Sequence, residues 1–193
     1  MLKRRIAAHP SLSVGAFCVD SGRALASLFL RPVAPAMFTA PVQWQDCAAV
    51  DVAPEQPTRS LFGVSLSSIQ PQAVEAMFAF LYPYLLKGGW RDIYLGSPIP
   101  GLRKALEKNA GMPIWSYVHA RRRRRSGEPT DPQLAYYHRK GFRQIVSIQR
   151  DYFPHVPSLN YGVILRGQIP LARFGALWRA TPLPLLKSVS QLL

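Results

Sequence analysis

The side chains best suited to acid–base chemistry lie in the segment 134–142, which reads Leu-Ala-Tyr-Tyr-His-Arg-Lys-Gly-Phe. Tyr137 carries a phenol, whose ordinary pKa of about 10 makes it a proton donor at neutral pH. His138 and His119 are alternative general bases, because an imidazole titrates near neutral pH. In a helix, however, Leu134, Tyr137 and His138 share one face, which is equally typical of a packed core. Tyr137 is therefore both a candidate catalytic residue and a candidate core residue.

Ser97 offers a hydroxyl just beyond the strand expected at 91–95. In open α/β sheets, ligands bind beyond the carboxyl ends of the parallel strands, so Ser97 is a second catalytic candidate. The histidines and cysteines lack the spacing of metal ligands, and we expect no metal. Cys18 and Cys47 are too few for a disulfide scaffold and are interpreted as reduced core residues.

Positive charge dominates the composition of the chain. Its 193 residues include 24 lysines and arginines against 10 aspartates and glutamates, a formal net charge of +14. Such a balance favours an anionic partner: a nucleic acid, an acidic protein, a phosphorylated cofactor or an anionic membrane. The charge peaks in the run Arg121, Arg122, Arg123, Arg124 and Arg125.

The elements that must position these residues alternate between strands and helices. Apolar and alternating runs predict strands at 14–20, 23–33, 60–67, 91–95, 142–152 and 161–167. Helical patterns predict helices at 73–86, 102–109, 113–123 and 131–140, the last with Asp131 as N-cap and Gly141 at its end. Residues 34–58 are expected to be irregular, with one extended piece at 47–52. We expect Pro83 to kink or end its helix, and residues 96–101 to form a rigid loop.

The order strand, helix, strand over residues 60–95 predicts two parallel strands with a right-handed crossover. The whole is interpreted as one α/β domain at 1–168 followed by a basic, apolar tail at 169–193. The tail either packs on the domain or lies on a membrane surface. We expect neither a signal peptide nor a membrane-spanning helix, and a cytoplasmic protein.

The segment 134–142 resembles the late signature of the GNAT superfamily of acyl-CoA N-acyltransferases, in which a helical tyrosine precedes Gly-Phe and a strand. Further short pieces resemble the GNAT-like domains of polyketide loading modules and of nitrilase fusions. These pieces are Trp44-Gln45-Asp46, Leu61-Phe62-Gly63-Val64, Ile99-Pro100-Gly101, Tyr117-Val118, Asp131-Pro132-Gln133-Leu134 and Asn160-Tyr161-Gly162-Val163. The resemblance covers residues 14–167 and implies a mixed sheet whose parallel strands splay apart around a pantetheine arm.

The resemblance also implies where a thioester would bind. Amides near a bulge in strand 60–67, from Val64 to Leu66, would polarise the thioester carbonyl. The start of the next helix would hold a pyrophosphate, and its counterpart here is Gln70-Pro71-Gln72-Ala73-Val74-Glu75. Tyr137 occupies the position of a tyrosine that protonates the departing thiolate. In decarboxylating relatives a threonine and a histidine act; Ser97 matches the former by position, but Tyr137 replaces the latter, which favours acyl transfer.

The phosphate-binding stretch departs from the family pattern. Ala73 and Glu75 stand where glycines are usual, and Pro71 has no amide proton. Three interpretations stay open: acyl-CoA is bound weakly, the donor is an acyl carrier protein, or the protein is non-catalytic. The arginine run is either a solvated insertion, a docking site for an acidic carrier protein or for the 3′-phosphate of CoA, or a nucleic-acid contact. The last is disfavoured, because aromatic residues are not interleaved with the arginines.

The chain is also short at its start relative to the family. A full GNAT fold begins with a strand and two helices, whereas about a dozen residues precede residue 14 here. The exposed sheet edge would need cover, from a homodimer, a partner subunit or residues 169–193. The sequence thus predicts an acyltransferase that uses acyl-CoA or a phosphopantetheine thioester as substrate and holds no tightly bound cofactor. Its alternatives are a docking module for an acidic carrier protein and a binder of nucleic acid or anionic membrane.

Overall fold

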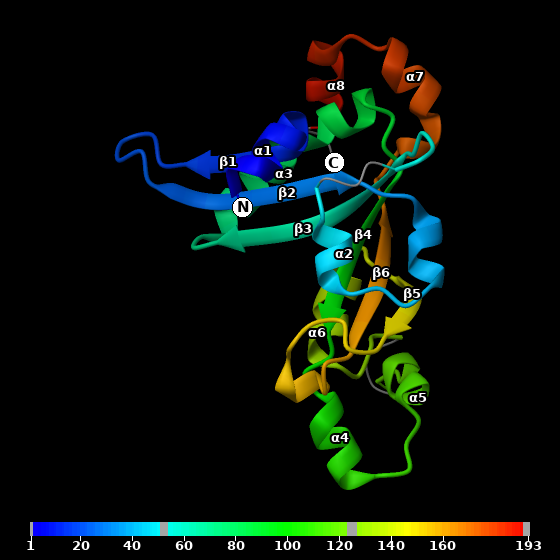
Figure 1. Cartoon of the computed structure of the whole chain (residues 1–193). Coiled ribbons are helices and arrows are strands. Elements are labelled where there is room, and N and C mark those ends of the chain that lie inside the picture. Colours follow the sequence, from blue (N-terminus) through cyan, green and yellow to red (C-terminus); the bar gives the residue numbers. More distant parts are fainter. Residues whose placement is uncertain (1, 51–53, 123–126, 191–193) are drawn as a thin grey trace. The chain divides into compact units, whose positions relative to one another are not determined.

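The computed structural model describes residues 2–50, 54–122 and 127–190. The chain forms two compact units, both visible in Figure 1. Unit 1 comprises Met1–Ala34, Ala48–Ile93 and Gln168–Leu193, and unit 2 comprises Pro35–Cys47 and Tyr94–Gly167. Arg123, Arg124 and Arg125, three members of the arginine run, lie outside the described residues.

The described strands form one mixed sheet with the order β1-β2-β3-β4-β6-β5. They are β1 (Ser13–Phe17), β2 (Ala24–Pro32), β3 (Ser60–Ser68), β4 (Asp92–Pro98), β5 (Gln144–Gln149) and β6 (Gly162–Gln168). The pairs β1–β2, β2–β3 and β5–β6 are antiparallel, whereas β3 and β4 form a parallel pair. The predicted mixed α/β sheet with one parallel pair is confirmed.

The core of unit 1 lies between its strands and the long helix α3 (Pro71–Lys87). Apolar residues of β2 and α3 form one buried cluster, which includes Leu28, Leu30, Met77, Leu81 and Leu85. Helices α7 (Gly175–Ala180) and α8 (Leu183–Ser190) pack on α3. The C-terminal segment therefore adopts the packed alternative of the two that the sequence left open.

One lysine joins the end of α3 to the C-terminal helices. The Lys87 ammonium donates to the carbonyl oxygens of Arg179 at 2.6 Å and Thr181 at 2.8 Å, at the end of α7. A cation is favourable there, because the last carbonyls of a helix carry partial negative charge. Leu186 of α8 is fully buried in the same cluster. Charge and apolar burial together hold the segment on α3.

Helix α3 does not end at Pro83, contrary to one of the two sequence expectations. The helix continues to Lys87, and Gly88 is its C-cap. Pro83 removes one backbone hydrogen bond. It is itself buried on the same helix as Leu81, Leu85 and Leu86, and burial of this apolar face outweighs the lost bond.

Unit 2 surrounds a second core with short helices. They are α2 (Trp44–Ala48), whose last residue belongs to unit 1, α4 (Leu102–Lys108), α5 (Ile114–His119) and α6 (Pro132–Arg139). Buried residues of β6, of the loop after β4 and of three of these helices share one cluster: Ile99, Leu102, Tyr117, Val118, Leu134, Val163 and Leu165. The glycine beyond α6, Gly141, has a φ of +94°, as its predicted C-terminal position requires.

Several predicted boundaries are wrong. Residues 47 and 48 are helical rather than extended, in α2, and residues 51–53 of the predicted extended piece lie outside the described residues. β4 continues to Pro98, because sheet pairing extends through the expected loop. α5 ends at His119 instead of 123, and α1 (Leu2–Ala8) was not foreseen.

Cys47 is buried as expected, but Cys18 is not in the core, because it lies in the turn between β1 and β2.

Asp131 is the predicted N-cap of α6, and it has a wider role. Its Oδ1 accepts the amides of Gln133 at 2.9 Å and Leu134 at 3.2 Å. Its Oδ2 accepts the Gly101 amide at 3.0 Å and the Tyr117 hydroxyl at 2.7 Å. Asp131 is only 1% exposed. One buried carboxylate therefore links the loop after β4, helix α5 and helix α6.

We expect Asp131→Ala to lower the free energy of unfolding by at least about 3 kcal/mol, because it removes a helix cap and leaves the Tyr117 hydroxyl and the Gly101 amide without an acceptor. Urea denaturation measures the change. Asp151→Asn is the matched control: Asp151 is exposed and has a φ of 52°, which asparagine tolerates. Equal stability of the two variants would contradict the assigned role of Asp131.

Candidate functional site

Strand β3 contains a β-bulge where the sequence expectation placed polarising amides. Phe29 of β2 is opposite Ser65 of β3, yet the next residue of β2, Leu30, is opposite Gly63. Val64 is thus the additional residue of β3. A bulge interrupts the hydrogen-bond ladder and re-aims the backbone groups next to it. The bulge implied by the family resemblance is therefore present, at one of the residues predicted to bind a thioester.

The side chains around the bulge differ in exposure. Val64 is 5% exposed and belongs to the interior, whereas Leu66 is 47% exposed. Neither side chain can polarise a carbonyl, so any chemistry at this point must come from backbone amides. This matches the kind of group that an oxyanion-stabilising site uses, namely fixed N–H dipoles.

The start of α3 offers few amides for a phosphate group. Pro71 has no N–H group, and the amide of Ala73 donates to the Gln70 carbonyl at 3.2 Å. The amide of Gln70 donates to the Ser68 hydroxyl at 3.0 Å. Gln70 and Gln72 are exposed, but Ala73 is buried in the core cluster of unit 1. The helix start therefore lacks the row of donor amides that cradles a pyrophosphate.

Glu75, which replaces a glycine of the family pattern, is not in the first turn of α3. The helix begins at Pro71, and its first turn contains no acidic residue. Glu75 is exposed in the next turn, where water screens its repulsion of a bound phosphate. The weakness of this phosphate site therefore lies in the missing amides rather than in the glutamate.

Tyr137 lies on α6 at the boundary of the unit 2 core. Its ring is half-buried and packs against the cluster that contains Leu134. It makes edge-to-face contacts with Tyr136, at a centroid distance of 5.3 Å, and with Phe142, at 6.1 Å. Burial raises the pKa of Tyr137, Gln133 opposes this rise through a hydrogen bond, and Tyr136 adds to it. The phenol therefore stays protonated at neutral pH, as a proton donor must.

The other catalytic candidates differ in their burial and in their contacts. Ser97 is fully buried, and its hydroxyl donates to the Pro98 carbonyl at 2.8 Å. His138 is half-buried beside Tyr137. His119 stacks on Trp115, with ring centroids 4.4 Å apart, and its Nδ1 lies 3.0 Å from the Trp115 carbonyl oxygen. Ser97 and His119 thus have local structural partners, whereas Tyr137 has the proton chemistry that the resemblance implies.

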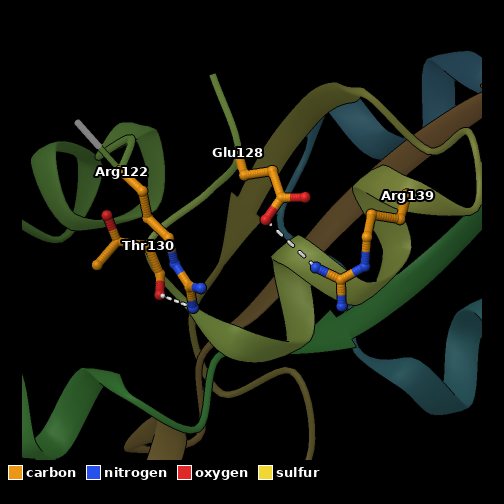
Figure 2. A network of polar contacts seen from close by, with 4 residues as sticks. All are labelled: Arg122, Glu128, Thr130 and Arg139. Carbon is orange, nitrogen blue, oxygen red and sulfur yellow. Dashed lines mark hydrogen bonds and ion pairs between the residues drawn. The ribbon is translucent and has the colours of Figure 1, made fainter. Parts of the chain in front are cut away.

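Arg121 and Arg122 contact backbone groups of neighbouring segments, and Figure 2 shows Arg122. Arg121 pairs with Pro129 in an antiparallel bridge, and its guanidinium donates to the carbonyls of Val118 and Ala120 at the end of α5. The Arg122 guanidinium donates to the Thr130 carbonyl at 3.4 Å. Both arginines of the run that the structure describes thus have internal contacts.

Figure 2 also shows the ion pair that anchors Glu128 to α6. The Arg139 guanidinium lies 3.3 Å from the Glu128 carboxylate. The pair is partly exposed, so it contributes at most about 1 kcal/mol. Its value is geometric: it fixes the residues that follow the arginine run against the helix that carries Tyr137.

His155, which the sequence analysis did not single out, has Ser158 as its hydrogen-bond partner. The Ser158 hydroxyl accepts the Ile99 amide at 2.9 Å and lies 2.7 Å from His155 Nδ1. Because Ser158 is fully buried, its proton is satisfied by donation to Nδ1. This bonding pattern assigns the ring proton of His155 to Nε2. No sequence signal could reveal the pair, because it depends on how the 155–160 loop returns to Ile99.

The predicted site residues divide between the two units. Val64, Leu66, Gln70, Gln72 and Ala73 belong to unit 1, and Ser97, Tyr137 and His138 belong to unit 2. Within the described ranges, histidines, cysteines and carboxylates do not gather into a group of three or more that could hold a metal. In the same part of the chain, no helix has both the length and the apolar character needed to cross a bilayer.

Comparison with known proteins identifies the fold. The sequence matches no protein-family model and no curated protein. The structure is similar to that of the GNAT-like decarboxylase GphF in complex with isobutyryl-CoA, with a TM-score of 0.60 and 20% identity over 87% of this chain and 83% of that one. It is also similar to the loading GNATL domain of CurA from Lyngbya majuscula, with a TM-score of 0.62 and 16% identity over 87% of this chain and 81% of that one.

Both likenesses extend over most of each chain. At these identities they establish the fold. The chain has the fold of the GNAT superfamily.

Proposed function

We propose that this protein is an acyltransferase whose donor is a pantetheine thioester carried by an acyl carrier protein. The observation that carries the proposal is the bulge at Val64 on β3, the strand that leads into the crossover helix α3. The fold supports a thioester ligand, because the similar GphF decarboxylase is described in complex with isobutyryl-CoA. The acceptor is an amine or hydroxyl compound of unspecified structure.

In the proposed reaction, amides next to the bulge donate to the thioester carbonyl oxygen. Negative charge develops on that oxygen when the acceptor attacks the carbonyl carbon, so fixed donors stabilise the transition state more than the ground state. The acceptor nitrogen or oxygen forms the new bond to carbon, and the carbon–sulfur bond breaks. The acceptor loses its proton to solvent.

Tyr137 is proposed to protonate the departing thiolate. A free thiol has a pKa of about 8.5, and burial raises the pKa of Tyr137 above its ordinary value. The phenol is therefore protonated when the thiolate forms, and solvent restores the proton afterwards. The half-buried position of the ring on α6 supports a fixed orientation for this transfer.

The start of α3 supports a carrier protein over free CoA as the donor. Pro71 has no amide proton, and the amide of Ala73 is occupied. A carrier-bound pantetheine has one phosphodiester and no adenosine diphosphate group, so it needs fewer donors at this point. The net charge of +14 also suits an acidic partner.

A docking module without catalytic activity is the second candidate. It is favoured by the Ser97 hydroxyl, which is buried and bonded to a neighbouring carbonyl instead of facing a ligand. In that case the carrier protein binds, but mass spectrometry with an acyl-loaded carrier protein shows no loss of the thioester over time. A control that lacks the protein measures the spontaneous hydrolysis of the thioester.

We expect Tyr137→Phe to lower the rate of thioester consumption about 100-fold or more, because it removes only the proton donor. Tyr136→Phe is the matched control, since Tyr136 neighbours Tyr137 on α6 but is 45% exposed. Both variants should keep the melting temperature of the parent. Equal turnover by Tyr137→Phe and the parent protein would rule out the proposed role.

A comparison of two small donors tests the phosphate site. Because the start of α3 has few donor amides, we expect the KM values for acyl-CoA and for the matching acyl-pantetheine to agree within about threefold, a difference of less than about 1 kcal/mol. Steady-state kinetics with the same acyl group on both donors measures the ratio. A KM that is at least about 100-fold lower for acyl-CoA would show a working nucleotide site and contradict the preference for a carrier protein.

A further inference from the structure

The outer face of helices α4 and α5 forms a surface suited to an acidic protein. We propose that this face, defined here as Arg103, Lys104, Lys108, Trp115 and His119, is the docking surface for the acyl carrier protein. The inference rests on the proposed function and adds to it the place where the partner binds. All five residues belong to unit 2.

The two helices lie on one core and turn their other sides to solvent. Leu102 of α4 and Tyr117 and Val118 of α5 are buried in the same cluster. The helices also contact each other directly. Because the two helices share one apolar core and contact each other, their solvent-facing sides belong to neighbouring elements. Arg103, Lys104, Lys108 and Trp115 are all exposed.

The charge of this face has one dominant sign. Helix α4 has the sequence Leu-Arg-Lys-Ala-Leu-Glu-Lys, which carries three cations and one carboxylate, Glu107. The cations recur at i and i+4, at Lys104 and Lys108, so two of them lie one above the other. Such a row attracts the carboxylates of an acidic partner and speeds its encounter, especially at low salt.

Trp115 supplies the apolar anchor that a charged rim alone would lack. Its side chain is 64% exposed, far more than expected for a tryptophan with a structural role. His119 stacks on one face of the ring and so restricts its motion. An exposed tryptophan held by a stacking partner, on a helix next to one rich in cations, has the composition of a protein-interface hot spot.

The same features disfavour a nucleic acid as the occupant. Single-stranded nucleic acids use successive aromatic rings on which bases stack. Here one face of the Trp115 ring is already covered by His119. Arg121 and Arg122 are less suitable than α4 for docking, because both contact carbonyls of their own loop.

The test measures binding of an acidic acyl carrier protein by isothermal titration calorimetry, separately from turnover. We expect the double variant Arg103→Glu/Lys104→Glu, and Trp115→Ala alone, each to weaken binding at least tenfold. Glutamates at the start of a helix are favourable, so the double variant should fold, and circular dichroism verifies this. The control is Arg143→Glu/Arg150→Glu, which makes the same change in net charge at exposed residues of unit 2.

The outcomes separate the docking surface from the proposed function. If the two test variants bind like the parent while thioester is still consumed, the surface is wrong and the acyltransferase stands. If the test variants lose the carrier protein but the parent consumes no thioester, the surface stands and the enzyme is refuted. An equal loss in the control variant, binding of single-stranded RNA in place of the carrier protein, or no binding by the parent would each overturn the surface.

Discussion

Unit 2 depends on one buried carboxylate, that of Asp131. Burial of a charged group is unfavourable unless hydrogen bonds replace its hydration. Asp131 meets this condition with four donors, from Gly101, Tyr117, Gln133 and Leu134. A side chain on residue 101 would overlap the Tyr117 hydroxyl, so only glycine fits there. The Ile-Pro-Gly piece that resembles the family is thus explained by packing around one carboxylate.

The hydrogen bonds of Asp131 also hold the two helices that carry residues with proposed functions. Helix α6 starts at the Asp131 cap, and Tyr137 follows in its second turn. Helix α5, which carries Trp115, is held through the hydroxyl of Tyr117. The raised pKa of Tyr117 has burial as its main cause, with the bond to Asp131 in second place. Tyr137, the proposed proton donor, and the exposed Trp115 are therefore both on elements that a single buried side chain connects.

The sequence predicted the elements of this fold better than their boundaries. The strand at 60–67 and the N-cap at Asp131 agree with β3 and α6, because an apolar run and a capped helix are local signals. β4 instead continues to Pro98, through Gly96, where the ring of Tyr152 occupies the place of a side chain. That contact joins residues far apart in the chain. The bond between Ser158 and the Ile99 amide is also long-range, and local sequence signals do not reveal it. Tyr137 was singled out from its local motif, and its proposed role stays a prediction.

The cations of this basic chain differ in the contacts that they make within it. Arg121 and Arg122 belong to the most basic run of the chain, yet their guanidinium groups contact carbonyls of their own segment. Arg139 is paired with Glu128. A guanidinium bonded to carbonyls of its own segment has fewer of its five N–H donors left for a partner and less freedom to reorient. The exposed cations of α4 therefore suit an anionic ligand better than Arg121 and Arg122 do.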